Sequence, residues 1–170
     1  SIINWKAIEA GEEEISNITL ALSSFYRTTL NKGNTMISIR MALENIKAYL
    51  QLQLWMHDND FQVNYQLDED TFDYMIPSLI FQPFVENSLE HGLDVKEDPD
   101  HQIWITVSQD DQVINVEIRD NGVGMDEETL EHILEYQAKG YGVKNVNDRM
   151  ILHYGAEYGV RIRSCPGEGT

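Results

Sequence analysis

Apolar residues in the first third of the chain recur at the three- and four-residue spacing of amphipathic helices. One stripe consists of Ile15, Ile18, Leu22 and Phe25, and residues 31–34 follow it as a turn. A second stripe has a heptad-like spacing and consists of Met36, Ile39, Leu43, Ile46, Leu50 and Leu54. Residues 1–58 are therefore predicted to form helices, which either cover their own domain or pair with a second copy.

From residue 60 onward the pattern changes to strands and shorter helices. Alternating apolar and polar positions predict strands over 61–67, 103–108, 113–119 and 160–163, the last of which needs a partner. Helical spacing predicts helices over 77–92, 126–136 and 143–153, with an acidic loop over 94–100. Pro77 suits a first helical turn, whereas Pro83 lies inside the pattern. This order predicts an α+β fold with helices on one face of a sheet.

Composition adds a large excess of acidic residues. The 170 residues include 12 Lys and Arg against 29 Asp and Glu, which gives a formal net charge of −17. Such a charge repels nucleic-acid phosphates and anionic membranes, so we expect no nucleic-acid partner. It also argues at first against a polyanionic ligand. The sequence has no apolar run of about eighteen residues, so we expect no membrane-inserted segment in it. The single cysteine, Cys165, excludes an intrachain disulfide and a cysteine-based zinc cluster.

The two ends of the sequence indicate that it is a piece of a longer protein. The chain begins at Ser1 without an initiator Met or a signal peptide, and it stops at Thr170 directly after a glycine-rich stretch. We therefore expect further residues on both sides.

A polar cluster lies beside the apolar face of the helix predicted over 77–92. Asn87 and Glu90 are three residues apart and share one helical turn, with Glu86 and His91 on neighbouring faces. These side chains form either a solvated surface or a ligand site. In a ligand site, Asn87 offers the uncharged oxygen that Mg²⁺ accepts beside its waters.

A glycine-containing segment follows the strand predicted over 113–119. Asp120 opens the sequence Asp-Asn-Gly-Val-Gly, which is a good turn sequence in its own right. The functional alternative is that the Asp120 carboxylate accepts a hydrogen bond from an exocyclic amine. Gly122 and Gly124 would then let a flat ring approach the backbone closely.

Two further glycine pairs are weaker signals when taken alone. Gly140 and Gly142 open the predicted helix over 143–153, where backbone amides can hold a phosphate. The pattern matches neither a Walker motif nor a complete dinucleotide fingerprint. Gly167 and Gly169 precede Thr170 in a Gly-x-Gly-Thr sequence.

The order and spacing of these segments resemble the GHKL superfamily of ATPases and kinases. Two stretches are similar to the LytS/YesM-like sensor histidine kinases of bacterial two-component systems, namely Gln82-Pro83-Phe84-Val85-Glu86-Asn87-Ser88 and Gly142-Val143-Lys144-Asn145-Val146-Asn147-Asp148-Arg149-Met150. The resemblance implies a Bergerat-type two-layer α/β sandwich with a mixed sheet over residues 59–170, an ATP-binding domain that lacks its last strand. Residues 1–58 would be the remainder of the helical dimerisation domain.

The resemblance also implies ATP and Mg²⁺ as cofactors and a role for individual residues. Asn87 would hold the Mg²⁺, and Asp120 would bind the adenine amine. Residues 126–140 would be a lid over the nucleotide. The other implied contacts are Gly122 and Gly124 around the ring, Gly140, Gly142 and Lys144 at the phosphates (with Lys139 and Arg149 as further candidates), and Thr170 on the adenine side.

The sequence departs from the family pattern in ways that bear on catalysis. The family's phosphoacceptor motif is absent from this sequence. None of its five histidines is a good acceptor, namely His57, His91, His101, His132 and His153. We therefore assign no catalytic residue to this chain. Glu90 stands where related kinases often carry a basic residue. Hydrolysing relatives carry a Glu four residues before the Asn, where this chain has Pro83.

These features favour transfer of a phosphoryl group to a histidine of the parent chain over ATP hydrolysis. The resemblance implies a response regulator as partner, a homodimer formed through the helical region, and a cytoplasmic position within a bacterial membrane receptor. The alternatives are an ATP-driven clamp, an anti-sigma-type serine kinase, which would lack residues 1–58, and a nucleotide-binding module without transfer activity.

Overall fold

A computed structural model of the chain describes residues 1–30, 34–58, 60–134 and 141–170. The described residues form two compact units. The first contains residues 1–60 and 72–79, and the second contains residues 61–71 and 80–170. The chain therefore passes from one unit to the other three times.

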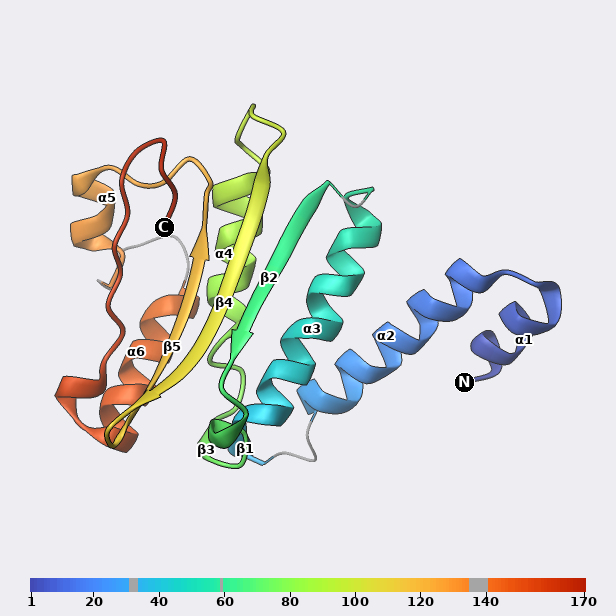
Figure 1. The fold of residues 1–170 in the computed structure, drawn as a ribbon, viewed down its shortest axis with the longest axis horizontal. Coiled ribbons are helices and arrows are strands. Elements are labelled where there is room, and N and C mark those ends of the chain that lie inside the picture. Colours follow the sequence, from blue (N-terminus) through green and yellow to red (C-terminus); the bar gives the residue numbers. More distant parts are fainter. Residues whose placement is uncertain (31–33, 59, 135–140) are drawn as a thin grey trace. The chain divides into compact units, whose positions relative to one another are not determined.

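The first unit is mainly helical (Figure 1). Its elements are α1 (Ile2–Ala10), α2 (Glu13–Leu30), β1 (Met36–Ser38), α3 (Ile39–Met56) and β3 (Met75–Pro77). The second predicted stripe is largely confirmed, because Ile39, Leu43, Ile46 and Leu50 are all buried on α3. Met36 is an exception, since it lies in β1 and pairs with Pro77 of the antiparallel β3.

The start of α3 is fixed by local hydrogen bonds. The Ser38 hydroxyl accepts from the amide of Met41 at 3.2 Å, which caps the helix. The first free amides of the helix, those of Ile39 and Arg40, donate to the carbonyls of Tyr74 and Phe72. These bonds replace the partners that a first helical turn lacks, so the helix begins at Ile39 instead of at Met36.

The stripe predicted on α2 is only partly correct. Ile15 and Leu22 are 48% and 43% exposed, whereas the buried positions include Ser16 and Thr19. The Ser16 hydroxyl donates to the side chain of Asn4 on α1 at 2.7 Å. Contact between α1 and α2 therefore uses small polar residues that spacing arguments about apolar positions do not detect.

The second unit is built on a mixed sheet, as predicted. Its strands are β2 (Phe61–Leu67), β4 (His101–Asp110) and β5 (Val113–Asp120), in the order β2-β4-β5. The strand β2 runs parallel to β4, and β5 runs antiparallel to β4. Figure 1 shows α4 (Gln82–Asn87) and α6 (Tyr141–Tyr154) behind this sheet.

The two layers of the second unit meet in an apolar core. Residues Ser88–Leu93 continue α4 as a π-helical turn. The sheet contributes Ile103, Ile105 and Val107 to the core, and the helical layer contributes Val85, Leu89, Leu93, Val143 and Val146. Burial of these side chains holds the strand ends in place beside α4. The remaining elements are α5 (Glu127–His132) and short 3₁₀ turns at Glu69–Thr71 and Ala156–Tyr158.

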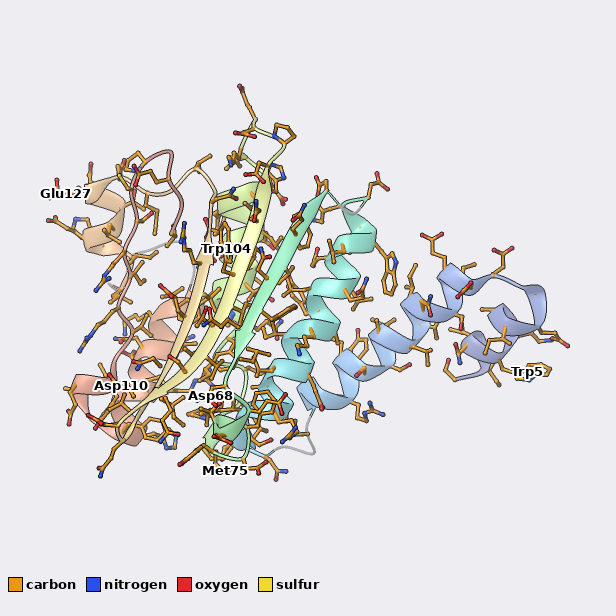
Figure 2. All side chains as sticks on the ribbon, viewed as in Figure 1. Trp5, Asp68, Met75, Trp104, Asp110 and Glu127 are labelled. Atoms are coloured by element: carbon orange, nitrogen blue, oxygen red, sulfur yellow. The ribbon has the colours of Figure 1, made fainter. Side chains whose placement is uncertain are left out.

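The other face of the sheet is largely polar. Trp104, labelled in Figure 2, stands on β4 opposite Arg119 of β5. The Arg119 guanidinium lies 4.8 Å from the centroid of the Trp104 ring, which is a cation–π contact. Asn64 of β2 donates to the side chain of Gln102 at 3.3 Å on the neighbouring strand.

Two predicted elements differ from the structure. The helix predicted over 77–92 begins at Gln82, because Pro77 ends β3 and Leu79 has a left-handed backbone with φ of 58°. Pro83 stands in the first turn of α4, where its missing N–H costs nothing. Residues 160–163, predicted as a strand, have no strand partner among the described residues.

The helices predicted over 126–136 and 143–153 are present with shifted ends. Asp126 caps α5 instead of belonging to it, and the helical residues described there are Glu127–His132. Residues 135–136 lie outside the described residues. Among the helices that the structure describes, none has both the length and the apolar character needed to cross a bilayer.

Candidate functional site

The candidate site centres on the Asp120 carboxylate, at the carboxyl end of β5. Asp120 is only 3% exposed. Its Oδ1 accepts from the amides of Gly122 at 2.9 Å and Thr170 at 3.2 Å. Its Oδ2 accepts from the Ser88 hydroxyl at 2.8 Å. Each carboxylate oxygen can accept about two hydrogen bonds. Among the described residues, two therefore fill Oδ1, and one leaves an acceptor position open on Oδ2.

Glycines surround this carboxylate because there is no room for side chains. A Cβ at Gly122 would lie 2.4 Å from the backbone of Gly92 in the helical layer. A Cβ at Gly92 would in turn lie 3.1 Å from Asp120 Oδ1. The amide of Val123 donates to the Gly92 carbonyl at 3.1 Å. The end of the π-helical turn and the segment after β5 are thus held in direct backbone contact.

The C-terminal segment closes the site from another side. The amide of Asp120 donates to the Thr170 carbonyl at 2.9 Å, and the amide of Gly167 donates to the Val123 carbonyl at 2.7 Å. Gly124 has φ of 66°, and a Cβ there would lie 2.0 Å from the Cys165 carbonyl oxygen. The structure therefore brings Asp120, Gly122, Gly124 and Thr170 together.

One hydroxyl ties this C-terminal segment to the glycine segment after β5. Ser164 Oγ accepts from the amide of Met125 at 2.8 Å. It also lies 2.8 Å from the Gly169 carbonyl and 2.9 Å from Thr170 Oγ1. Ser164 thus contacts three backbone or side-chain groups that flank the carboxylate.

Asn87 is the last residue of α4 and directly precedes Ser88, whose hydroxyl contacts Asp120. Its side chain is half-buried and makes no hydrogen bond to another described residue. Within α4 the Gln82 amide donates to Glu86 Oε1 at 2.7 Å. Glu90 and His91 lie in the π-helical turn and are exposed.

The predicted phosphate side is described only in part. Gly142, in the first turn of α6, lies so close to α4 that a Cβ there would be 2.9 Å from the Pro83 Cβ. The Lys144 ammonium pairs with Asp148 one turn further along α6. Gly140, Lys139 and the end of the predicted lid over 126–140 lie outside the described residues.

The start of the predicted lid segment is a well-capped helix. Asp126 Oδ1 accepts from the amide of Thr129 at 2.8 Å. The pKa of the Asp126 carboxyl is lowered by its hydrogen bond with the Thr129 side chain and then by this bond with the Thr129 amide, both of which favour the ionised form. The negative charge also suits a helix N-terminus.

Sequence reasoning assigned no role to three residues of the site: Ser88, Gly92 and Ser164. Ser88 is adjacent to Asn87 in the motif, so its position alone could have drawn attention to it. Gly92 ends a helical pattern, where a glycine is commonly explained as a helix terminator. Ser164 is 39 residues from Met125 in sequence, and no local pattern signals that contact.

The fold agrees with comparisons to known proteins. The family model described as "Histidine kinase-, DNA gyrase B-, and HSP90-like ATPase" matches residues 73–170, which is more than half of the chain. The chain therefore belongs to this family of ATPases. A second model, described as "Histidine kinase", matches residues 1–61.

Curated relatives point to one branch of the family. The chain is 28% identical over 169 residues to the sensor protein LytS of Staphylococcus epidermidis, covering 96% of this chain and 28% of that protein. It is 26% identical over 168 residues to the sensor histidine kinase YesM of Bacillus subtilis, covering 99% and 28%. The sensor histidine kinase BtsS of Escherichia coli is 26% identical over 163 residues. The chain thus spans about 28% of the length of these relatives.

A solved structure supports the fold. The histidine kinase ThkA, crystallised in complex with the response regulator protein TrrA, aligns with a TM-score of 0.50 and 14% identity. The alignment covers 84% of this chain and 45% of that chain. At this level of identity the likeness bears on the fold alone, and it agrees with the predicted α+β architecture with a mixed sheet.

Proposed function

We propose that the chain is the ATP-binding catalytic part of a two-component sensor histidine kinase, which transfers the γ-phosphoryl group of Mg-ATP to a histidine of its parent protein. The observation that carries the proposal is the buried Asp120 carboxylate, which keeps one acceptor position open on Oδ2. The exocyclic amine of adenine supplies the donor that this position lacks. Gly122 and Gly124 shape the space beside it.

The remaining binding roles extend from this anchor. Thr170, whose amide and carbonyl bond to Asp120, lies on the adenine side of the site. Gly140 and Gly142 supply amides to the phosphates at the start of α6, and Lys144 adds a positive charge there. Residues 126–140 act as the lid, which gates access to the nucleotide.

Asn87 fits a magnesium ligand. Its amide oxygen is uncharged, half-buried and not committed to another described residue. Since Mg²⁺ keeps several waters and binds substrate phosphates, one protein oxygen is enough to place it. When bound, the ion neutralises charge on the phosphates that are being transferred.

We further propose residues 59–170 as the ATP-binding domain and residues 1–58 as part of the helical dimerisation region. Support comes from the "Histidine kinase" model, which matches residues 1–61, and from the sensor kinases that resemble the whole chain. The parent protein is then a homodimeric membrane receptor of a bacterium with this part in the cytoplasm. Its partner is the receiver domain of a response regulator, and none of the five histidines of this chain accepts the phosphoryl group.

The chemistry of α4 favours phosphoryl transfer over hydrolysis. A hydrolysing clamp needs a carboxylate base to activate water, and Pro83 cannot serve in that role. Glu86 is the nearest acid in α4, but its Oε1 accepts from Gln82 on the same helix at 2.7 Å. The site can therefore hold Mg-ATP without providing a base for an attacking water.

Phosphate release separates the kinase from an ATP-driven clamp. With Mg-ATP, we expect the chain to release inorganic phosphate at the rate of buffer alone, under conditions where it binds nucleotide. The variant Glu86→Gln serves as the control, because it should release phosphate at the same background rate. Sustained turnover by the unaltered chain that Glu86→Gln abolishes would instead support the clamp.

A further inference from the structure

The inference concerns Ser164 and rests on the proposed function, because it concerns the base that the same site selects. Ser164 Oγ lies within hydrogen-bonding distance of three groups: the Met125 amide, the Gly169 carbonyl and the Thr170 hydroxyl. A serine hydroxyl has one proton to donate and two lone pairs that accept. Three contacts therefore use its full capacity, and each contact can be assigned a direction.

The direction of each bond follows by elimination. The Met125 amide can only donate, so it occupies one lone pair of Ser164 Oγ. The Gly169 carbonyl can only accept, so the 2.8 Å contact requires the single proton of Ser164. The 2.9 Å contact with Thr170 is then a hydrogen bond only if the Thr170 hydroxyl donates to Ser164.

This assignment leaves Thr170 Oγ1 as an acceptor. Its only proton is used by Ser164, so its lone pairs alone are available to a ligand. The same holds for Ser88, whose proton is used by Asp120 Oδ2 at 2.8 Å. The open position on Asp120 Oδ2 is an acceptor as well, so the hydroxyls of Ser88 and Thr170 and this carboxylate oxygen can accept hydrogen bonds from a ligand but donate none to it.

We propose that Ser164 is a positioning residue for base selection. By accepting the hydrogen bond that Thr170 donates, it leaves the Thr170 hydroxyl no proton to donate to the base. The site therefore favours 6-amino over 6-oxo purines. A 6-amino group brings the donors that these acceptor oxygens require. A 6-oxo group places another acceptor against a carboxylate, with no donor to relieve it.

The test compares ADP with inosine diphosphate, which carries an oxygen in place of the 6-amino group. Calorimetric titrations of the unaltered chain should show preferential binding of ADP. In Ser164→Ala the Thr170 hydroxyl no longer donates to residue 164, so it can donate to a 6-oxo group. The preference for ADP over inosine diphosphate should then fall by about tenfold. Ser164→Thr keeps the hydroxyl and should retain the preference.

A second variant tests the route through Thr170. Thr170→Val removes the acceptor while conserving shape, so it should also lower the ADP preference. In that background Ser164→Ala should cause no further change in the ratio, because the hydroxyl through which it acts is gone. Thr170→Val also serves as the test if Ser164→Ala does not fold.

The outcomes separate this inference from the proposed function. If the unaltered chain binds neither nucleotide, the proposed function is contradicted, and the inference is contradicted with it. If Ser164→Ala weakens ADP and inosine diphosphate by the same factor, Ser164 only supports the loop and the inference alone is overturned. An unchanged ratio in Thr170→Val overturns it as well.

Discussion

Asp120→Asn is expected to weaken binding of ADP by roughly 100-fold while the chain stays folded. In Asp120 the Oδ1 oxygen accepts two backbone amides, so the oxygen of an asparagine must take that position. The asparagine nitrogen would then replace Oδ2 and present protons where, in the proposed site, the adenine amine also presents protons. Losing a hydrogen bond to a charged group costs about 2–3 kcal/mol, which corresponds to a decrease in ADP affinity of roughly 100-fold.

The matched control is Asp111→Asn, the same chemical change in the turn between β4 and β5. Asp111 has φ of 50°, a left-handed conformation that asparagine tolerates. Its ADP affinity should equal that of the unaltered chain in the same calorimetric titration. Equal affinities in all three proteins would remove Asp120 from the site.

Gly124→Ala is expected to destabilise the second unit and to weaken nucleotide binding. Its φ of 66° is left-handed, which costs an alanine about 1 kcal/mol. In addition, the new Cβ would lie 2.0 Å from the Cys165 carbonyl and 3.1 Å from the Gly169 carbonyl. Both obstacles are backbone atoms that cannot rotate away, so the segment that holds Thr170 must move.

Gly167→Ala separates the steric effect from the backbone effect. Gly167 lies in the same C-terminal segment and has φ of 81°, but a Cβ there meets nothing within 4 Å. Overpacking adds about 1–3 kcal/mol, so Gly124→Ala should melt roughly 4–10 °C below Gly167→Ala. Identical melting temperatures and ADP affinities for the two variants would show that the close contact of Gly124 does not matter.

The sequence predicts the strands of the mixed sheet better than the starts of the helices. The bounds of β2 follow from clean alternation over 61–67, and the strands predicted over 103–108 and 113–119 are present as β4 and β5. The helix predicted from Pro77 fails because proline suits both the end of a strand and the first turn of a helix. Only the pairing of β3 with β1, a contact across 41 residues from Met36 to Pro77, decides between them.

In the site, too, contacts between residues close in sequence could be predicted, whereas contacts between distant segments could not. The motif Asp-Asn-Gly-Val-Gly places Asp120, Gly122 and Gly124 next to one another, so their grouping is readable from the chain. The contacts of Gly92 and Ser164 come from packing between segments far apart in sequence. Serine and glycine are too common for a single position to predict such contacts.

The net charge of −17 argued at first against a polyanionic ligand. The proposed site does not depend on net charge, because in it Asp120 would face the base and not the phosphates. The phosphates would be bound by Mg²⁺, by backbone amides at the start of α6 and by Lys144, all of which act over short distances. The overall charge still argues against nucleic acid as a partner.

The most direct test of the central claim is a calorimetric titration of the unaltered chain with a non-hydrolysable ATP analogue, with Mg²⁺ and then with a chelator present. We predict saturable binding to one site per chain with Mg²⁺ and weaker binding after the metal is removed, because in the proposed site Asn87 would contact the phosphates through the ion. Absence of binding at millimolar analogue with Mg²⁺ present would contradict the account.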